Sequence, residues 1–156
     1  MSRLRTVQEY FEQVKHQVSA SGCSTDWTAV RFHRRSKTSG WVEAEELRFP
    51  DDATLRFIEE VVINRDGTVD RIAYSFNYDR PEGETWSGAE GTLSHGNICC
   101  SFRYDRDPAR ARPIVHEECH LHVNDLRDTR GEELRFRTHA TTFEEVFEFI
   151  RCVFYS

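Results

Sequence analysis

Three histidines, His116, His120 and His122, occupy even positions of the segment HEECHLH at residues 116–122. Alternate side chains of an extended strand point to the same face, so the three imidazoles are expected to share one face. The intervening positions, such as Leu121, are apolar enough to place the other face on a core. Imidazole titrates near neutral pH and also binds metal ions, so this pattern predicts either proton transfer or metal ligation.

Two kinds of chemistry fit such a strand, and a third interpretation needs none. Paired imidazoles can act as acid and base in phosphodiester cleavage. Alternatively, His-x-His on one face supplies two metal ligands, to which His116 and Glu118 would add two more. The simplest interpretation is a solvated strand face that carries histidines without a function.

A second candidate segment, Phe102-Arg103-Tyr104-Asp105, lies just upstream of the histidines. Arg103 could hold a phosphate, and Tyr104 could donate a hydrogen bond or stack on a base. Alternatively, the arginines of this region pair with Asp105 and Asp107 on the surface. The candidates for phosphate or partner binding are Arg106, Arg110, Arg112, Asp105 and Glu59.

Alternation along residues 54–63 and 68–79 predicts which side chains enter the core. Glu59 interrupts an otherwise apolar face of the first segment, so it lies either at a sheet edge or in a polar cleft. In the second segment, Tyr74 and its alternate neighbours invite comparison with RNA-stacking platforms, but a core role is favoured. The residues predicted to share that face are Ile72, Tyr74, Phe76 and Tyr78.

The elements that must position these side chains form an α+β protein. Short turns between successive strand patterns favour antiparallel neighbours, and therefore one curved meander of about six or seven strands with a helix at each end. The predicted helices are 6–20 and 141–153, and residues 80–96 form a long hairpin loop. The predicted strands are 27–36, 41–49, 54–63, 68–79, 97–105, 114–124 and 133–139. The single domain 1–156 thus comprises a helical extension (1–25), the sheet (27–139) and the final helix (141–153).

Composition narrows the class of protein further. A net charge of −6 argues against a broad nonspecific nucleic-acid coat, although a local basic patch remains compatible with it. The five cysteines are odd in number and include no CxxC pair, which favours a reducing cytoplasm. No segment reaches the ~20 apolar residues of a membrane span, and the amphipathic start differs from a signal peptide.

Taken in order, these segments resemble the TumE family, the presumed toxin component of a prokaryotic toxin–antitoxin pair. The resemblance covers about residues 40–150. It departs from the family pattern at Asp52-Ala53 and at Arg106, and the N-terminal helix and the 80–96 loop look like additions. The positions that fit the family are Asp51, Leu55, Phe57, Glu59, Arg103, Tyr104, Asp105, His120 and His122. Membership implies an RNA-directed activity and a cognate antitoxin.

Three hypotheses follow. The first is a metal-independent ribonuclease in which His120 and His122 act as acid and base, assisted by His116, while Arg103 and Tyr104 position the phosphate. The antitoxin would then cover this cleft, and no cofactor is predicted. The second is a non-enzymatic module that binds protein or nucleic acid through the same face. The third is a hydrolase with a divalent metal on His116, Glu118, His120 and His122. An exposed strand 133–139 could support a homodimer.

Overall fold

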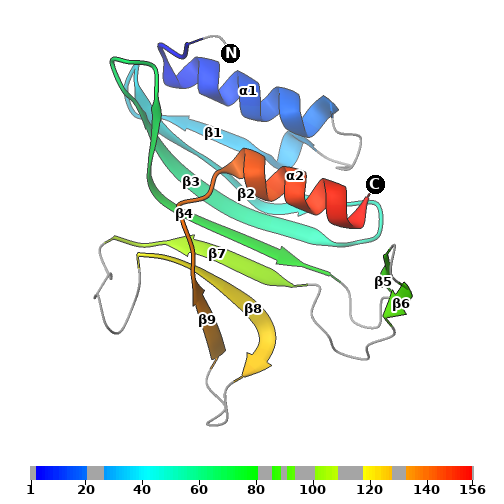
Figure 1. Cartoon of the computed structure of the whole chain (residues 1–156). Helices are drawn as coiled ribbons and strands as arrows, with labels where there is room; N and C mark the ends of the chain where they lie inside the picture. The colour runs from blue at the N-terminus through cyan, green and yellow to red at the C-terminus, as the bar shows by residue number, and fades with distance from the viewer. Residues whose placement is uncertain are drawn as a thin grey trace.

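The computed structural model describes residues 3–20, 27–80, 86–88, 91–93, 101–108, 118–127 and 133–155. In these residues two helices flank one seven-stranded antiparallel sheet, which confirms the predicted α+β class (Figure 1). The helices are α1 (Val7–Ala20) and α2 (Phe143–Phe154). The strands lie side by side in chain order: β1 (Arg31–Arg34), β2 (Ser39–Arg48), β3 (Thr54–Ile63), β4 (Val69–Asp79), β7 (Phe102–Arg106), β8 (Cys119–Arg127) and β9 (Glu133–Arg137).

Two predicted segments differ from the observed elements. The first predicted strand begins later, because Trp27–Ala29 form a 3-10 turn before β1. The predicted 80–96 loop contains a small hairpin, in which β5 (Trp86–Gly88) pairs with β6 (Gly91–Leu93). The parts of predicted strands 97–105 and 114–124 that precede residues 101 and 118 lie outside the described residues.

The core lies between the helices and one face of the sheet, which we call the helix face. On β4, Tyr74, Phe76 and Tyr78 are buried there, as the core interpretation predicted. Burial of such rings stabilises the fold by removing large apolar areas from water. The apolar stripes of both helices cover them. These stripes are Val7, Tyr10, Phe11, Val14 and Val18 on α1, and Phe143, Val146, Phe147 and Ile150 on α2.

Helix α2 begins at Phe143, two residues after the predicted start, with Thr142 as its N-cap. The Thr142 side chain accepts from the backbone N–H of Glu145, and the Glu145 carboxylate accepts from the backbone N–H of Thr142. This capping box satisfies two backbone donors that the first helical turn leaves without partners. The short connection from β9 thereby fixes α2 over the sheet.

A β-bulge interrupts the pairing of β3 with β4. Glu60 pairs with Ala73 and the next residue, Val61, pairs with Arg71, so Ile72 has no partner of its own. The bulge changes the alternation of β4, and Ile72 is exposed rather than in the core face where alternation predicted it. Arg71 takes the position on the helix face instead.

The helices cover only part of the sheet. Figure 1 shows α1 and α2 over the β1–β4 side, with β8 and β9 extending beyond them. Helix α2 reaches β7 through Phe149, whose ring centroid lies 5.5 Å from that of Phe102. Neither helix, nor any other part of the described chain, has the length and apolar character needed to cross a lipid bilayer.

Candidate functional site

The face of the sheet opposite the helices carries a row of side chains in direct register across five strands. Ile58 pairs with Ser75, Ser75 with Asp105, Asp105 with His120, and His120 with Arg137. Directly paired residues of neighbouring strands place their side chains on the same face and close together. We call this the open face, since α1 and α2 pack on the other side.

Asp105 is the centre of this row. Its Oδ1 accepts a hydrogen bond from Ser75 Oγ at 2.6 Å, and its Oδ2 accepts one from Arg103 Nε at 2.6 Å. The Nε2 atoms of His120 and His122 lie 3.7 and 3.6 Å from the same Oδ2. One carboxylate oxygen thus faces a guanidinium and two imidazoles.

Arg103 also fixes the state of the second imidazole. Its Nη2 lies 3.1 Å from Nε2 of His122. A guanidinium only donates hydrogen bonds, so in this contact Nε2 is the acceptor and the ring proton is on Nδ1. The two imidazole rings are neighbours, with centroids 4.7 Å apart. We call Arg103, Asp105, His120 and His122 the histidine cluster.

The histidine cluster lines a hollow of about 610 Å³ on the open face, together with Glu60 and Arg106. Both imidazoles are buried, whereas the Arg103 side chain retains 37% of its exposure and that of Asp105 retains 16%. A molecule that enters the hollow therefore meets the guanidinium first and reaches the imidazoles only past it.

The metal-ligand set suggested by the sequence is replaced by a different one. Glu118 lies just before β8 and its Oε1 accepts from Arg106 Nε at 2.7 Å, away from the histidines. Among the described residues, the carboxylate that joins His120 and His122 is Asp105, with the three ligand atoms within 4.8 Å of one another. Arg103 donates to two of these three atoms, which disfavours a cation between them.

Tyr104 is on the wrong face for the role that the sequence predicted. It alternates with Arg103 and Asp105, and its ring packs against Phe102 on the helix face at 5.7 Å between centroids. Burial raises the pKa of its phenol, and the nearby Glu145 carboxylate raises it further. Tyr104 therefore does not line the hollow.

Glu59 is also separated from the histidine cluster. It is completely buried on the helix face, where Tyr10 donates to Oε2, and Arg71 Nε (3.0 Å) and the backbone N–H of Phe143 (3.3 Å) donate to Oε1. Burial raises the pKa of Glu59 despite these donors, and burial likewise raises that of Tyr10. This carboxylate links α1, β4 and the start of α2, which is a structural role.

Some predicted site residues cannot be placed, and one neighbour was missed. His116, Arg110 and Arg112 lie outside the described residues. Ser75, which holds Oδ1 of Asp105, was not predicted, because only the register between β4 and β7 brings the two together.

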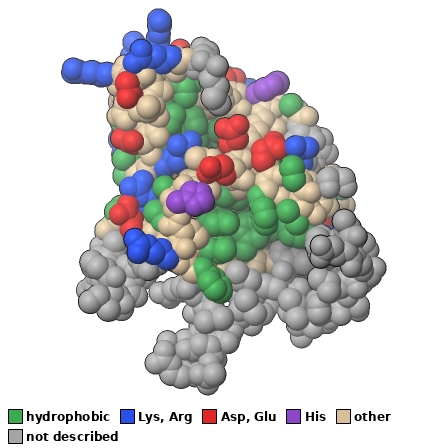
Figure 2. All heavy atoms as spheres, viewed as in Figure 1, with side chains coloured by type: hydrophobic (Ala, Val, Ile, Leu, Met, Phe, Trp, Pro, Cys, Tyr) green, Lys and Arg blue, Asp and Glu red, His purple; other side chains and the backbone are tan. Residues whose placement is uncertain are grey.

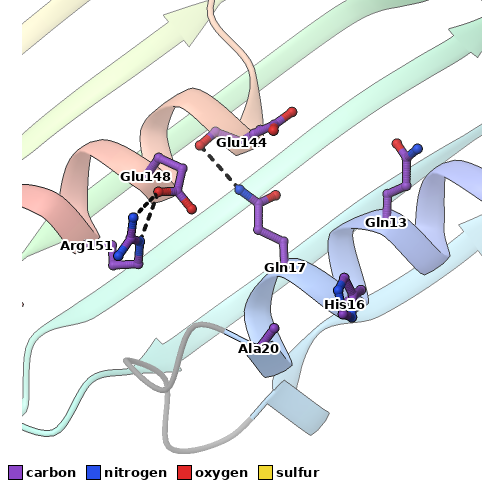
Figure 3. A pocket seen from close by; sticks show the side chains of 7 residues that line it. All are labelled: Gln13, His16, Gln17, Ala20, Glu144, Glu148 and Arg151. Atoms are coloured by element: carbon purple, nitrogen blue, oxygen red, sulfur yellow. Dashed lines mark hydrogen bonds and ion pairs between the residues drawn. The ribbon is translucent and has the colours of Figure 1, made fainter. Parts of the chain in front are cut away.

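A second hollow, of about 500 Å³, lies between the two helices (Figure 3). Gln17 Nε2 on α1 donates to the backbone oxygen of Glu144 at 3.4 Å, and Arg151 pairs with Glu148 at 2.7 Å on α2. The Gln17–Glu144 hydrogen bond ties the two helices together, whereas the Arg151–Glu148 pair lies within α2. The described lining of this second hollow includes one histidine, His16, which Figure 3 shows without a carboxylate partner.

The fold and the cluster define a small α+β protein with helices on one face of an antiparallel sheet and a polar site on the other. The chain belongs to the TumE family: the sequence model of that family, described as toxin TumE, matches residues 14–153, and the resemblance noted from the sequence is confirmed. The family suggests the toxin component of a toxin–antitoxin system and implies a cognate antitoxin. Comparisons with curated proteins and with solved structures give no match.

Proposed function

We propose that this member of the toxin family acts on RNA, by metal-independent phosphodiester cleavage at the histidine cluster. The observation that carries the proposal is that one carboxylate oxygen, Oδ2 of Asp105, has two imidazoles and one guanidinium around it. RNA carries its own nucleophile, the 2′-hydroxyl, so cleavage requires a base, an acid and a group that stabilises the phosphorane charge.

The two imidazoles have different surroundings, which suits different roles. His122 accepts a hydrogen bond at Nε2 from Arg103, so it is held neutral and able to take a proton as the base. His120 has Nε2 at 3.7 Å from Oδ2 of Asp105, so in this proposal the carboxylate orients the ring that acts as the acid.

Arg103 connects binding to chemistry in this proposal. Its exposed guanidinium offers a bidentate partner to a phosphate. A bound phosphate competes with Asp105 and His122 for the same N–H groups. Moving the guanidinium toward the phosphate frees Nε2 of His122 for the 2′-hydroxyl proton, and leaves the positive charge where the phosphorane forms.

Burial of both imidazoles favours one alternative, a binding module without catalysis. In that case Asp105 and the histidines support Arg103 from below, and the guanidinium alone contacts the partner. The metal-dependent alternative is less favoured, because Arg103 would first have to leave two ligand atoms.

The first experiment is inducible expression of wild type and of His120→Ala and His122→Ala, with purified proteins assayed on single-stranded RNA in excess EDTA. We expect growth arrest and RNA cleavage by wild type, and losses of roughly 10²–10⁴-fold in the cleavage rate of each variant. His139→Ala is the matched control, since His139 is exposed and outside the hollow.

Three outcomes would count against the proposal. Cleavage by wild type that stops in EDTA favours the metal-dependent alternative. Growth arrest that persists in both folded histidine variants, but not in Arg103→Ala, favours the binding module. Absence of arrest and of cleavage in wild type removes RNA as the substrate.

A further inference from the structure

The sheet is wider than its two helices can cover. Strands lie ~4.8 Å apart, so seven of them span roughly 29 Å between the first and last axes. A helix packed on a sheet is about 10 Å across, so two helices cover about four strands. Figure 1 shows that the strands without a helix over them are those at the β7–β9 end of the sheet. The uncovered width is close to that of one helix.

The uncovered end is apolar on the helix face. Tyr104, Leu121 and Phe136 pair in register across β7, β8 and β9, which places their side chains in one row. Phe149 on α2 packs against Phe102, and the Phe102 ring in turn contacts Tyr104 of this row. We call these four residues the apolar patch. Figure 2 shows hydrophobic side chains gathered on this side of the molecule, with acidic, basic and histidine side chains around them.

Exposure within the apolar patch is unusual for side chains of this size. Phe136 is 45% exposed and Phe149 is 47% exposed. The other large exposed hydrophobics among the described residues, Ile58 and Ile72, lie respectively on the open face and at the bulge. Exposed aromatic side chains on one side of a small protein favour an interaction site.

One acidic side chain, Glu145, lies at the α2 border of the apolar patch. Glu145 precedes Phe149 by one helical turn on α2, and its carboxylate is close enough to Tyr104 to raise the pKa of that phenol. The chain as a whole carries a net charge of −6. A partner that presents cations beside an apolar stripe is therefore electrostatically matched to this surface and attracted to it at long range.

We propose that the apolar patch is the docking site of the antitoxin, and that the occupant is one amphipathic helix with an apolar stripe and a basic edge. Family membership implies the partner, the uncovered width matches one helix, and the exposed Glu145, one helical turn before Phe149, favours a cation beside it. The docked helix continues the layer that α1 and α2 begin.

This docking site lies on the reverse of the proposed catalytic site. Arg103 and Asp105 alternate with Tyr104 along β7, and His120 and His122 flank Leu121 on β8. Docking therefore leaves the hollow on the open face uncovered. The proposal depends on the family and not on RNA cleavage, and its test measures binding alone.

The experiment uses the full chain and its cognate antitoxin, with the dissociation constant measured by calorimetry. We expect Phe136→Glu and Phe149→Glu each to weaken binding by about 30-fold or more, as for central aromatic contacts of an interface. Ile72→Glu is the matched control, because it adds the same charge at an exposed hydrophobic outside the apolar patch. Thermal unfolding of each variant verifies the fold.

Hydrogen exchange on the wild-type complex keeps the test independent of any variant. We expect new protection in β9 and α2, and none at Ser75 or Arg103. Protection of the open face, with unchanged binding by both phenylalanine variants, would overturn the proposal. It would favour an antitoxin that binds in the hollow on the open face instead. A wild-type homodimer that Phe136→Glu dissociates would overturn it in favour of a second copy as the occupant.

Discussion

Two carboxylates in this protein, Glu59 and Asp105, are surrounded by similar donors but differ in access. Glu59 accepts hydrogen bonds from Tyr10, from Arg71 and from a backbone N–H at the start of α2, and it is completely buried. Asp105 accepts hydrogen bonds from Ser75 and Arg103, and it lines the hollow on the open face. Each carboxylate has a guanidinium and at least one hydroxyl as partners.

The difference shows how a structural charge can be told from a candidate working charge. At Glu59 every donor belongs to a different element of the core, so the contacts hold α1, β4 and α2 together. At Asp105 the donors lie on the open face and the guanidinium remains partly hydrated. A cluster of polar groups thus suggests chemistry only where another molecule can reach it.

Replacement of Glu59 is expected to have the largest effect on stability. Glu59→Ala leaves Arg71 without its buried partner and should cost about 3–5 kcal/mol of unfolding free energy. Asp105→Ala is the matched control and should cost about 1 kcal/mol, because Arg103 can turn to water. Urea unfolding of both variants measures the comparison, and equal losses would show that access does not distinguish the two sites.

Removal of Arg103 is expected to have an intermediate effect, on metal binding. Arg103→Ala frees Oδ2 of Asp105 and Nε2 of His122, so a Zn²⁺ ion should bind about tenfold more tightly than to wild type. Calorimetric titration with Zn²⁺ measures the change, and Arg106→Ala serves as a control because Arg106 pairs with Glu118. Unchanged affinity would mean that Arg103 does not guard the ligand atoms.

The smallest effect should appear as a pH dependence at Glu59. Its pKa in the folded protein is raised above the ordinary value of 4.5, so the folded state holds this proton more tightly than the unfolded state does. The unfolding free energy of wild type, relative to Glu59→Gln, should therefore fall as pH rises from about 4.5 through the raised pKa, and then level off. Unfolding curves across this range test the slope, and a rise instead of a fall would contradict burial as the dominant cause.

Regular alternation and capping allowed much of the fold to be predicted from the sequence. Strand 54–63 was predicted with the observed bounds, because turns bracket an alternation that is apolar on one face except at Glu59. The sequence signal of a Thr-x-x-Glu cap, at Thr141 or Thr142, located the start of α2 to within two residues, and the structure selects Thr142 with Glu145. Both signals are local, so they do not depend on the rest of the chain.

Features that depend on pairing between distant strands were predicted incorrectly or missed. The bulge at Ile72 changes the alternation of β4 and brings Arg71 to Glu59. The partnership of Asp105 with Ser75 depends on how β7 pairs with β4. Tyr104 is different, because its alternation with Arg103 along the strand already implied the opposite face.

The alternation along β7 and β8 also limits which sequence changes this protein can tolerate in evolution. Odd positions of β7 carry the histidine cluster and even positions carry the apolar patch, with the reverse order on β8. A gain or loss of one residue within either strand would exchange the two faces, presenting imidazoles where aromatic rings belong. Insertions and deletions are therefore expected only in the turns of this region, whereas residues within the strands are expected to change by substitution.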